Sequence, residues 1–142
     1  MDKTYLAVVE GLPEPASGTL VANIIRTHMR SRIAREPSPK AQEAELSYQV
    51  LAAAKGLSLI EIKPATGRHH QIRVQLSSAG YPIVGDLKYG ASDKLQDRSI
   101  ALHAVSLTVK HPVLEEQVRL KTPPPKQHPW KWFRTAIEDR FS

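Results

Sequence analysis

The sequence predicts an α+β fold, in which helices flank a largely antiparallel mixed sheet. Two stretches, 46–62 and 105–120, alternate apolar with polar residues, and a turn divides each of them into a pair of strands. After Gly67 the apolar residues recur with the period of a helix, and a second helical stripe lies near the end of the chain. Strands grouped in hairpins, with single helices between them, favour an α+β architecture.

The first element expected is a buried strand. Residues Tyr5 to Val9 are apolar and β-prone, and Gly11 and Pro13 end the run. A strand that begins so close to Met1 suggests that the natural domain continues upstream. We therefore interpret residues 1–142 as a single domain and expect it to be partial.

The next segment, Gly18 to Lys40, is the most basic part of the chain. Ile25, Met29 and Ile33 recur every four residues, which predicts a short helix that the following prolines end. Its charged residues are five cations and one acid: Arg26, Arg30, Arg32, Arg35, Lys40 and Glu36.

Two hairpins are expected in the middle and late parts of the chain. Residues 46–50 alternate in polarity, Gly56 turns the chain, and residues 57–62 return as a more apolar strand. Residues 105–120 predict the second hairpin, with His111-Pro112 at its turn.

Two helices complete the expected fold. Apolar residues at i, i+4 and i+7 between Ile72 and Ala79 predict a helix, and Gly80 is well placed to end it in a left-handed conformation. A C-terminal helix is expected to begin at Pro129 and to dock one apolar stripe on the sheet. That stripe consists of Trp130, Phe133, Ile137 and Phe141.

Composition favours a polyanionic partner. Lys and Arg number 20 and Asp and Glu 14, so the formal charge is +6, which attracts RNA or DNA. No apolar run reaches the length of a bilayer span, and the N-terminus lacks the profile of a signal peptide, so no membrane partner is expected. The absence of cysteine excludes disulfides and thiol chemistry, and a cytoplasmic location is the default expectation.

The junction before the first helix predicts an anion site. Gly67 allows close approach of a ligand, and the guanidinium of Arg68 lies beside the N–H groups of a helix start. His69, His70 and Gln71 add donors and acceptors for ribose or base edges. The alternative is structural: the arginines form salt bridges and the histidines cap the helix.

Arg73 and Tyr5 each allow two interpretations. The charge of Arg73 needs a partner, and no carboxylate lies one turn away on the helix. The partner therefore lies elsewhere in the fold or outside the chain, unless the side chain extends to water. Tyr5 is either a core aromatic residue or a platform on which a flipped base stacks, with a phenol able to move a proton.

No metal or cofactor is expected. His69 and His70 are adjacent, and on a helix they would point apart; no other ligand spacing accompanies them, and cysteine is absent. No serine occupies a Gly-x-Ser-x-Gly setting. Asp86 lies in a turn between Gly85 and Gly90, and we interpret its carboxylate as part of the turn.

Taken in order, these segments resemble the RluA-like family of RNA pseudouridine synthases over nearly the whole chain. Thr66–Arg73 is similar to the family's Thr-Gly-Arg-Thr-His-Gln-Ile-Arg, with His69 in place of the usual threonine. Gly80–Gly90 resembles its Gly-x-Pro-Ile-x-Gly-Asp-x-x-Tyr-Gly turn. Lys3–Gly11 looks like the strand that follows its catalytic motif, and Ile100–Ala104 like its closing strand.

The resemblance implies a cofactor-independent isomerase that flips a uridine out of RNA, breaks its C1′–N1 bond and rejoins the base through C5. Tyr5 would match the tyrosine that stacks on the base and assists C5 deprotonation, and Arg73 the arginine that pairs with the nucleophilic aspartate. That aspartate lies in a His-Arg-Leu-Asp-like motif that is absent here, and no aspartate of this chain replaces it. Asp86 belongs to the turn, and Asp93, Asp97 and Asp139 lie outside any matching motif. We therefore expect the chain alone to be inactive.

The same resemblance implies an RNA substrate, either rRNA or tRNA. The residues expected to contact it are Arg68, His69, His70, Gln71, Lys88, Arg26, Arg30 and Arg32.

Two other roles remain open at this point. One is a non-catalytic RNA-binding module that keeps the cleft, which the basic segment from Arg26 to Lys40 favours. The other is a half-domain that completes another chain, because an unpaired edge beside Tyr5 to Val9 would invite a partner strand. A missing N-terminal half, or a second chain that completes the sheet, is an expected partner.

Overall fold

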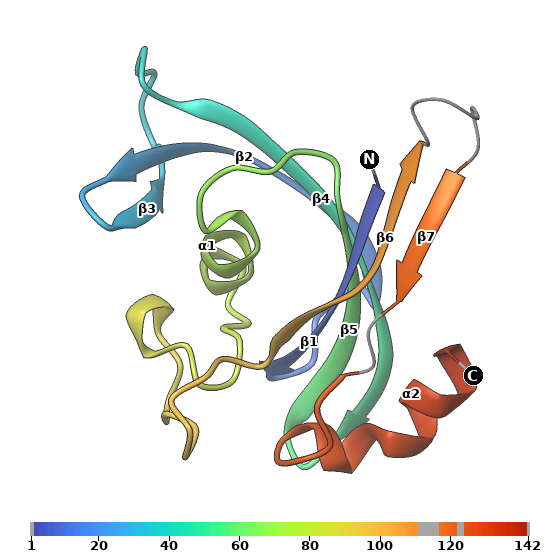
Figure 1. Cartoon of the computed structure of the whole chain (residues 1–142). Helices are drawn as coiled ribbons and strands as arrows, with labels where there is room; N and C mark the ends of the chain where they lie inside the picture. The colour runs from blue at the N-terminus through green and yellow to red at the C-terminus, as the bar shows by residue number, and fades with distance from the viewer. Residues whose placement is uncertain (1, 111–116, 122–123, 142) are drawn as a thin grey trace.

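The computed structural model describes residues 2–110, 117–121 and 124–141 (Figure 1). Its strands are β1 (Asp2–Glu10), β2 (Ser17–Thr27), β3 (Arg30–Ile33), β4 (Gln42–Ala54), β5 (Leu57–Pro64), β6 (Leu102–Lys110) and β7 (Gln117–Lys121). Its helices are α1 (Gln71–Ser78) and α2 (Arg134–Phe141), with the short 3-10 helices η1 (Leu87–Tyr89) and η2 (Trp130–Phe133).

Within the described ranges, the strands form one sheet in the order β3-β2-β4-β5-β1-β6-β7, and each neighbouring pair is antiparallel. The sheet curves around α1, and the C-terminal helical segment lies on its other side (Figure 1). The expected α+β class and largely antiparallel sheet are confirmed. The turn predicted at His111-Pro112 lies outside the described residues.

Strand β1 is the centre of the core. Its residues Leu6, Ala7, Val8 and Val9 are all fully buried, because elements cover both faces of the sheet at this point. Such a strand consists of a continuous apolar run rather than an alternating one, which is how it could be identified in the sequence.

The central place of β1 corrects one expectation. β1 pairs with β5 through Tyr5–Ile62 and with β6 through Tyr5–Ala104, so both of its edges are occupied. The edge beside Tyr5 to Val9 therefore offers no site for a strand from another chain.

The helix predicted in the basic segment is wrong. Residues 17–33 form a hairpin instead, in which Ile25 of β2 lies opposite Arg32 of β3 and Met29 adopts a positive φ of 58° at the tip. The four-residue spacing of Ile25, Met29 and Ile33 therefore spans two strands and a turn. β-branched residues of β2 and β3 favour extended backbone, and the pairing of β2 with both β3 and β4 decided the outcome.

The remaining predicted elements are confirmed. β4 and β5 form the first hairpin, and Gly56 has a φ of 75° at its turn. Helix α1 ends before Gly80, which has a φ of 96°. The C-terminal segment begins with a 3-10 turn, and Trp130 and Phe133 enter the core.

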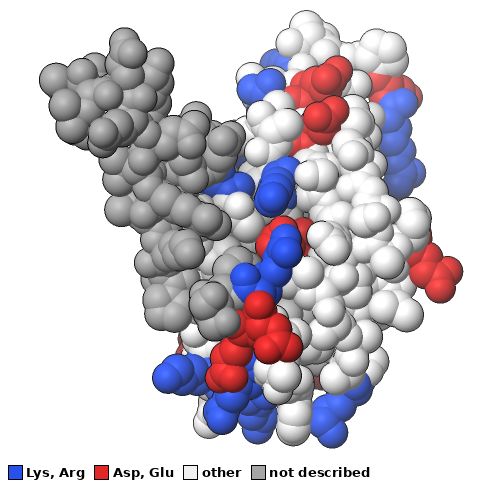
Figure 2. Space-filling view, turned by 90° about the vertical axis from the view of Figure 1, so that its right-hand side faces the viewer, with Lys and Arg blue, Asp and Glu red and all other residues white. Residues whose placement is uncertain are grey.

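Two surface features bear on partners. No helix in the part of the chain that the structure describes is long and apolar enough to cross a membrane. Figure 2 faces the right-hand side of Figure 1 and shows acidic and basic side chains interspersed there. The excess of positive charge is therefore not gathered over the visible part of this face.

Candidate functional site

A cleft of about 440 Å³ lies between β1 and the start of α1. Its volume falls within the range of small-ligand pockets. Hereafter "the cleft" means this site. Its polar lining residues are Lys3, Tyr5, Thr66, Arg68, His70, Gln71 and Arg73.

The loop that forms one wall of the cleft is held by the amide of Gln71. The Gln71 Oε1 accepts hydrogen bonds from the Thr66 hydroxyl at 2.7 Å and from the Arg68 N–H at 3.0 Å. Its Nε2 donates to the Glu45 carbonyl at 3.0 Å. Because this side chain is buried and bonded on both ends, its main role is to shape the loop rather than to bind a ligand directly.

Arg68 is fixed at one edge only. Its Nε donates to the Glu43 carbonyl at 2.9 Å, and the side chain remains partly exposed. Among the residues that the structure describes, Arg68 forms no salt bridge, so the structural alternative of an ion pair is wrong for it. The rest of its guanidinium lines the cleft and is available to an anion.

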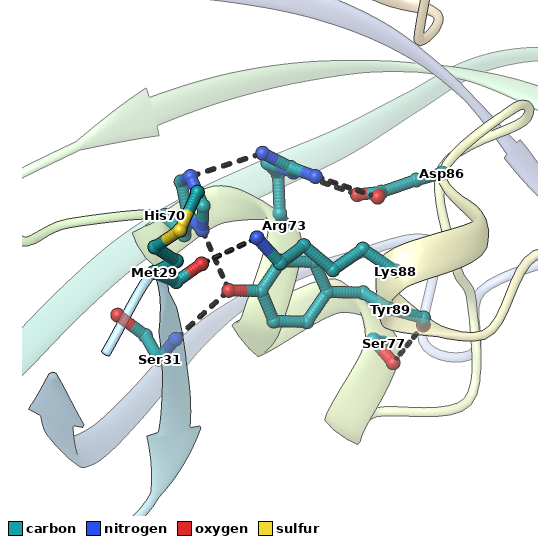
Figure 3. Close-up of polar contacts among 8 residues, drawn as sticks. All are labelled: Met29, Ser31, His70, Arg73, Ser77, Asp86, Lys88 and Tyr89. Carbon is teal, nitrogen blue, oxygen red and sulfur yellow. Dashed lines mark hydrogen bonds and ion pairs between the residues drawn. The ribbon is translucent and has the colours of Figure 1, made fainter. Parts of the chain in front are cut away.

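Arg73 has a carboxylate partner within the chain. Its Nε donates to Asp86 Oδ2 at 2.9 Å and its Nη2 to Asp86 Oδ1 at 2.8 Å (Figure 3). The Asp86 side chain is 1% exposed, and the hydrogen bond to it raises the pKa of Arg73 above its usual range. The alternative that Arg73 extends to water is therefore wrong, and Asp86 does more than build a turn.

His70 lies between Arg73 and Tyr89. Burial, with a further contribution from the charge of Arg73, lowers the pKa of His70 to about 4, so the ring is neutral at pH 7. Its Nε2 lies 3.1 Å from Arg73 Nη1 and must accept, because a guanidinium only donates. The proton is therefore on Nδ1, which donates to the Tyr89 hydroxyl at 2.6 Å (Figure 3).

The same network reaches the β2–β3 hairpin. The Ser31 N–H donates to the Tyr89 hydroxyl at 2.9 Å, and the Lys88 ammonium donates to the Met29 carbonyl (Figure 3). The turn that carries Asp86 is thereby tied to the tip of the hairpin. Three segments far apart in sequence meet at the back of the cleft: the hairpin, the start of α1 and η1.

The two adjacent histidines do not point apart as expected. Their rings stack with centroids 3.8 Å apart, because His70 precedes α1 with a φ of 54° instead of being within the helix. His69 turns away from the cleft, and its Nδ1 lies 3.0 Å from Ser31 Oγ. His70 occupies the N-cap position of α1, as the capping alternative expected, but its side chain makes no capping hydrogen bond.

The structure thus divides the candidate residues into two groups. The first group lines the cleft together and consists of Tyr5, Arg68, His70, Gln71 and Arg73. The second group does not line the cleft. Its members lie on or against the β2–β3 hairpin and are His69, Lys88, Arg26, Arg30 and Arg32.

Sequence reasoning missed Lys3 and the pairing of Asp86. Lys3 is two residues before Tyr5 on β1, and alternate residues of a strand lie on the same face of the sheet. The position of Tyr5 could therefore have indicated that Lys3 lines the same cleft. Asp86 is 13 residues from Arg73 in a different element, and no local pattern reports such a contact.

Two kinds of group are absent from the cleft. None of its lining residues in the described ranges is an aspartate or glutamate. The described residues also contain no group of three or more His, Cys, Asp or Glu side chains that could hold a metal ion. The cleft offers cations, one neutral imidazole and a phenol.

The chain is similar to known proteins over most of its length. A family model described as RNA pseudouridylate synthase matches residues 1–78. The Bacillus subtilis protein named uncharacterized RNA pseudouridine synthase YhcT is 39% identical over 127 residues, which are 88% of this chain and 41% of that protein. Mouse RNA pseudouridylate synthase domain-containing protein 1 is 32% identical over 133 residues, 87% of this chain and 44% of that protein.

A solved structure gives the same result. Human RNA pseudouridylate synthase domain containing 1 superposes with a TM-score of 0.72 at 27% identity, covering 96% of this chain and 65% of that one. The chain spans less than half the length of the two curated relatives named above.

Proposed function

Because this chain belongs to the family of RNA pseudouridylate synthases, we propose that it forms the uridine-binding side of an active site that converts uridine to pseudouridine in RNA. In that reaction the C1′–N1 bond breaks, a C1′–C5 bond forms, C5 loses a proton and N1 gains one. No oxidant, reductant or cofactor is needed to balance it. The observation that carries the proposal is that Tyr5, Arg68, His70 and Arg73 line one cleft.

Tyr5 is the residue proposed to hold the base. It is on the central strand β1, so its ring has a rigid support, and the side chain is partly exposed at the cleft. A phenol ring in that position provides an aromatic face for an extruded pyrimidine and a hydroxyl for the removal of the C5 proton.

Arg73 is proposed to orient the attacking carboxylate. Asp86 occupies its Nε and Nη2, so the guanidinium is held in one orientation before any ligand arrives. Its Nη1 lies toward His70, which also lines the cleft. A second carboxylate entering the cleft would therefore meet a prepositioned cation.

The nucleophile itself is proposed to come from outside these 142 residues. Asp86 is unsuited to attack, because it is buried and both of its oxygens bond to Arg73. No carboxylate of the described residues lines the cleft. The chain would then supply binding and orientation, and a further segment or chain would supply the aspartate.

The substrate is proposed to be rRNA or tRNA in the cytoplasm. The formal charge of +6 and the cations Lys3 and Arg68 at the cleft favour a polyanion over a free nucleoside.

A second candidate function is a non-catalytic RNA-binding module. The absence of a carboxylate among the described lining residues favours it, since such a cleft can bind a uridine without attacking it.

Release of tritium from C5 of labelled uridines in RNA tests these proposals. The chain alone should bind RNA and release none; release by the chain alone would overturn the proposal that its nucleophile is missing. A chimera in which this chain replaces the matching part of the B. subtilis relative should release tritium, and its Tyr5→Ala variant should not. If the chimera binds RNA but stays inactive while the relative is active, the chain is the non-catalytic module.

A further inference from the structure

A second hollow, of about 830 Å³, lies between β3 and α1, and we call it the arginine pocket. It shares no lining residue with the cleft. Its polar rim consists of Arg30, Arg32, Arg35, Glu36, Ser38 and Ser78.

The floor of the arginine pocket is rigid and apolar. It is formed by Ile25, Val74 and the ring of Tyr89, which are all buried. Val74 and Tyr89 belong to a small buried cluster that joins α1 to the β2–β3 hairpin. A hollow with such a floor keeps its shape when it is empty.

The rim carries an excess of positive charge that no carboxylate in the described part of the chain neutralises. Arg32 and Arg35 make no ion pair with any carboxylate that the structure describes, and Glu36 is the one acid lining the pocket. Arg30 lies over the Tyr89 ring, with its Cζ 5.1 Å from the centroid. Because three guanidinium groups face one carboxylate, an anion in the pocket would relieve their mutual repulsion.

The donors around the pocket suit a phosphate better than a base. Guanidinium forks match phosphate oxygens, and the Ser38 hydroxyl, which accepts one hydrogen bond from the Lys40 N–H at 3.2 Å, can still donate. The Tyr89 ring is 3% exposed and so offers no stacking face to a base. A pocket of this kind recognises the backbone rather than the sequence.

The arginine pocket is joined to the cleft through one residue. The Tyr89 ring forms part of the pocket floor, while its hydroxyl bonds to His70, which lines the cleft. The pocket and the cleft are therefore neighbouring sites, separated by one hydrogen-bonded pair of side chains.

We propose that the arginine pocket binds a backbone phosphodiester of the same RNA whose uridine enters the cleft. This inference rests on the proposed function and deepens it, because it gives the RNA a second anchoring point beside its target nucleotide. The hairpin β2–β3 acts as one wall of that anchor.

Fluorescence anisotropy of a labelled RNA hairpin, measured over a series of salt concentrations, tests the proposal. The variant Arg32→Gln/Arg35→Gln should bind more weakly, and its slope of log K against log salt should fall by about one per arginine removed. The matched control is Lys131→Gln/Arg134→Gln, which removes two exposed cations at the other end of the molecule and should keep the wild-type slope. A wild-type slope in the pocket variant would overturn the inference.

Competitors distinguish the possible anions. Inorganic phosphate at equal phosphate concentration should displace the RNA far less than unlabelled RNA does; equal displacement would assign the pocket to free phosphate and overturn the proposal. If polyglutamate displaced the labelled RNA as effectively as unlabelled RNA does, the proposal would also be overturned, and the ligand of the pocket would be an acidic protein. If the pocket variant keeps the wild-type slope while RNA still binds in the cleft, only the proposal for the arginine pocket is refuted. If the wild-type chain binds no RNA, both this proposal and the proposed function are refuted.

Discussion

Arg73 and Asp86 form a bidentate ion pair across 13 residues of sequence, with hydrogen bonds of 2.9 and 2.8 Å. The pair joins the helix that forms the cleft to the turn that follows it (Figure 3). It also leaves the third guanidinium nitrogen, Nη1, against His70. The cation proposed to meet the nucleophile is thus fixed by the fold of this chain and not by its ligand.

Removing Arg73 should destabilise the fold strongly. Arg73→Met leaves the Asp86 carboxylate, 1% exposed, without its partner, and we expect a loss of about 3–5 kcal/mol in the free energy of unfolding. Urea denaturation measures it. Arg68→Met is the control, because the Arg68 side chain donates to a backbone carbonyl near the surface and pairs with no described carboxylate, and it should cost less than about 1 kcal/mol.

A double variant separates the pair from its parts. Arg73→Met/Asp86→Leu should lose less stability than the two single variants summed, because it leaves no buried charge unpaired. Strict additivity would contradict the coupling inferred here.

Acid should weaken the fold through His70. Its pKa is about 4 in the native state, against 6.5 for an ordinary histidine, so only the unfolded chain gains a proton as the pH falls from 6.5 to 4. Stability should therefore decline across that window, and His70 should have no effect on its pH dependence well above 6.5. Nitrogen-15 shifts of the ring should show the Nδ1–H tautomer at neutral pH.

The matched variant is His70→Gln, which should flatten the decline. His69 contributes in the same direction, because burial and the nearby charge of Arg26 lower its pKa, so His69→Gln should be measured separately. A ring of His70 that titrates near its ordinary value would contradict the contact with Arg73.

The turn that carries Asp86 should tolerate no side chain at Gly85. A Cβ there would lie 2.7 Å from the Ser99 carbonyl oxygen and 2.9 Å from Leu95 Cγ, at a φ of +89°. We expect Gly85→Ala to cost roughly 2–4 kcal/mol in thermal or urea unfolding. Gly56→Ala, with a φ of +75° and nothing near its Cβ, should cost only about 1 kcal/mol; equal losses would show that the turn is not tightly packed.

The C-terminal helix should depend on Glu61 of β5. Arg140 donates two hydrogen bonds of 3.0 Å to this buried carboxylate, while Lys63 lies 4.0 Å from it. Arg140→Met should destabilise by about 1–2 kcal/mol, since Arg140 is 45% exposed and water partly replaces it. Arg134→Met, on an exposed site of the same segment, should be nearly neutral in the same urea titration.

The sequence predicted those elements whose apolar pattern is local and strong. Each of three segments has an apolar pattern that is typical of a single kind of element. These segments are the buried run 5–9, the hairpin 46–62 and the helix ended by Gly80. The segment 18–40 failed because three apolar residues spaced by four happened to fall on two strands and a turn. Strand pairing, which is non-local, decided that segment.

The site was predictable only in part for the same reason. Tyr5, Arg68 and Arg73 could be chosen from motifs, and the structure brings them to one cleft. The pairing of Arg73 with Asp86 and of His70 with Tyr89 joins segments that sequence spacing does not relate. The positive φ of His70, which brings the two histidine rings together, has no signature in the sequence.

Photo-cross-linking of an RNA hairpin that carries a single 5-iodouridine tests the central claim most directly. At saturating RNA, mass spectrometry should map the cross-link to residues that line the cleft, with Tyr5 foremost, and the Arg68→Gln variant should lower its yield. Cross-links confined to residues outside the cleft, at a yield that neither Tyr5→Ala nor Arg68→Gln changes, would contradict the account.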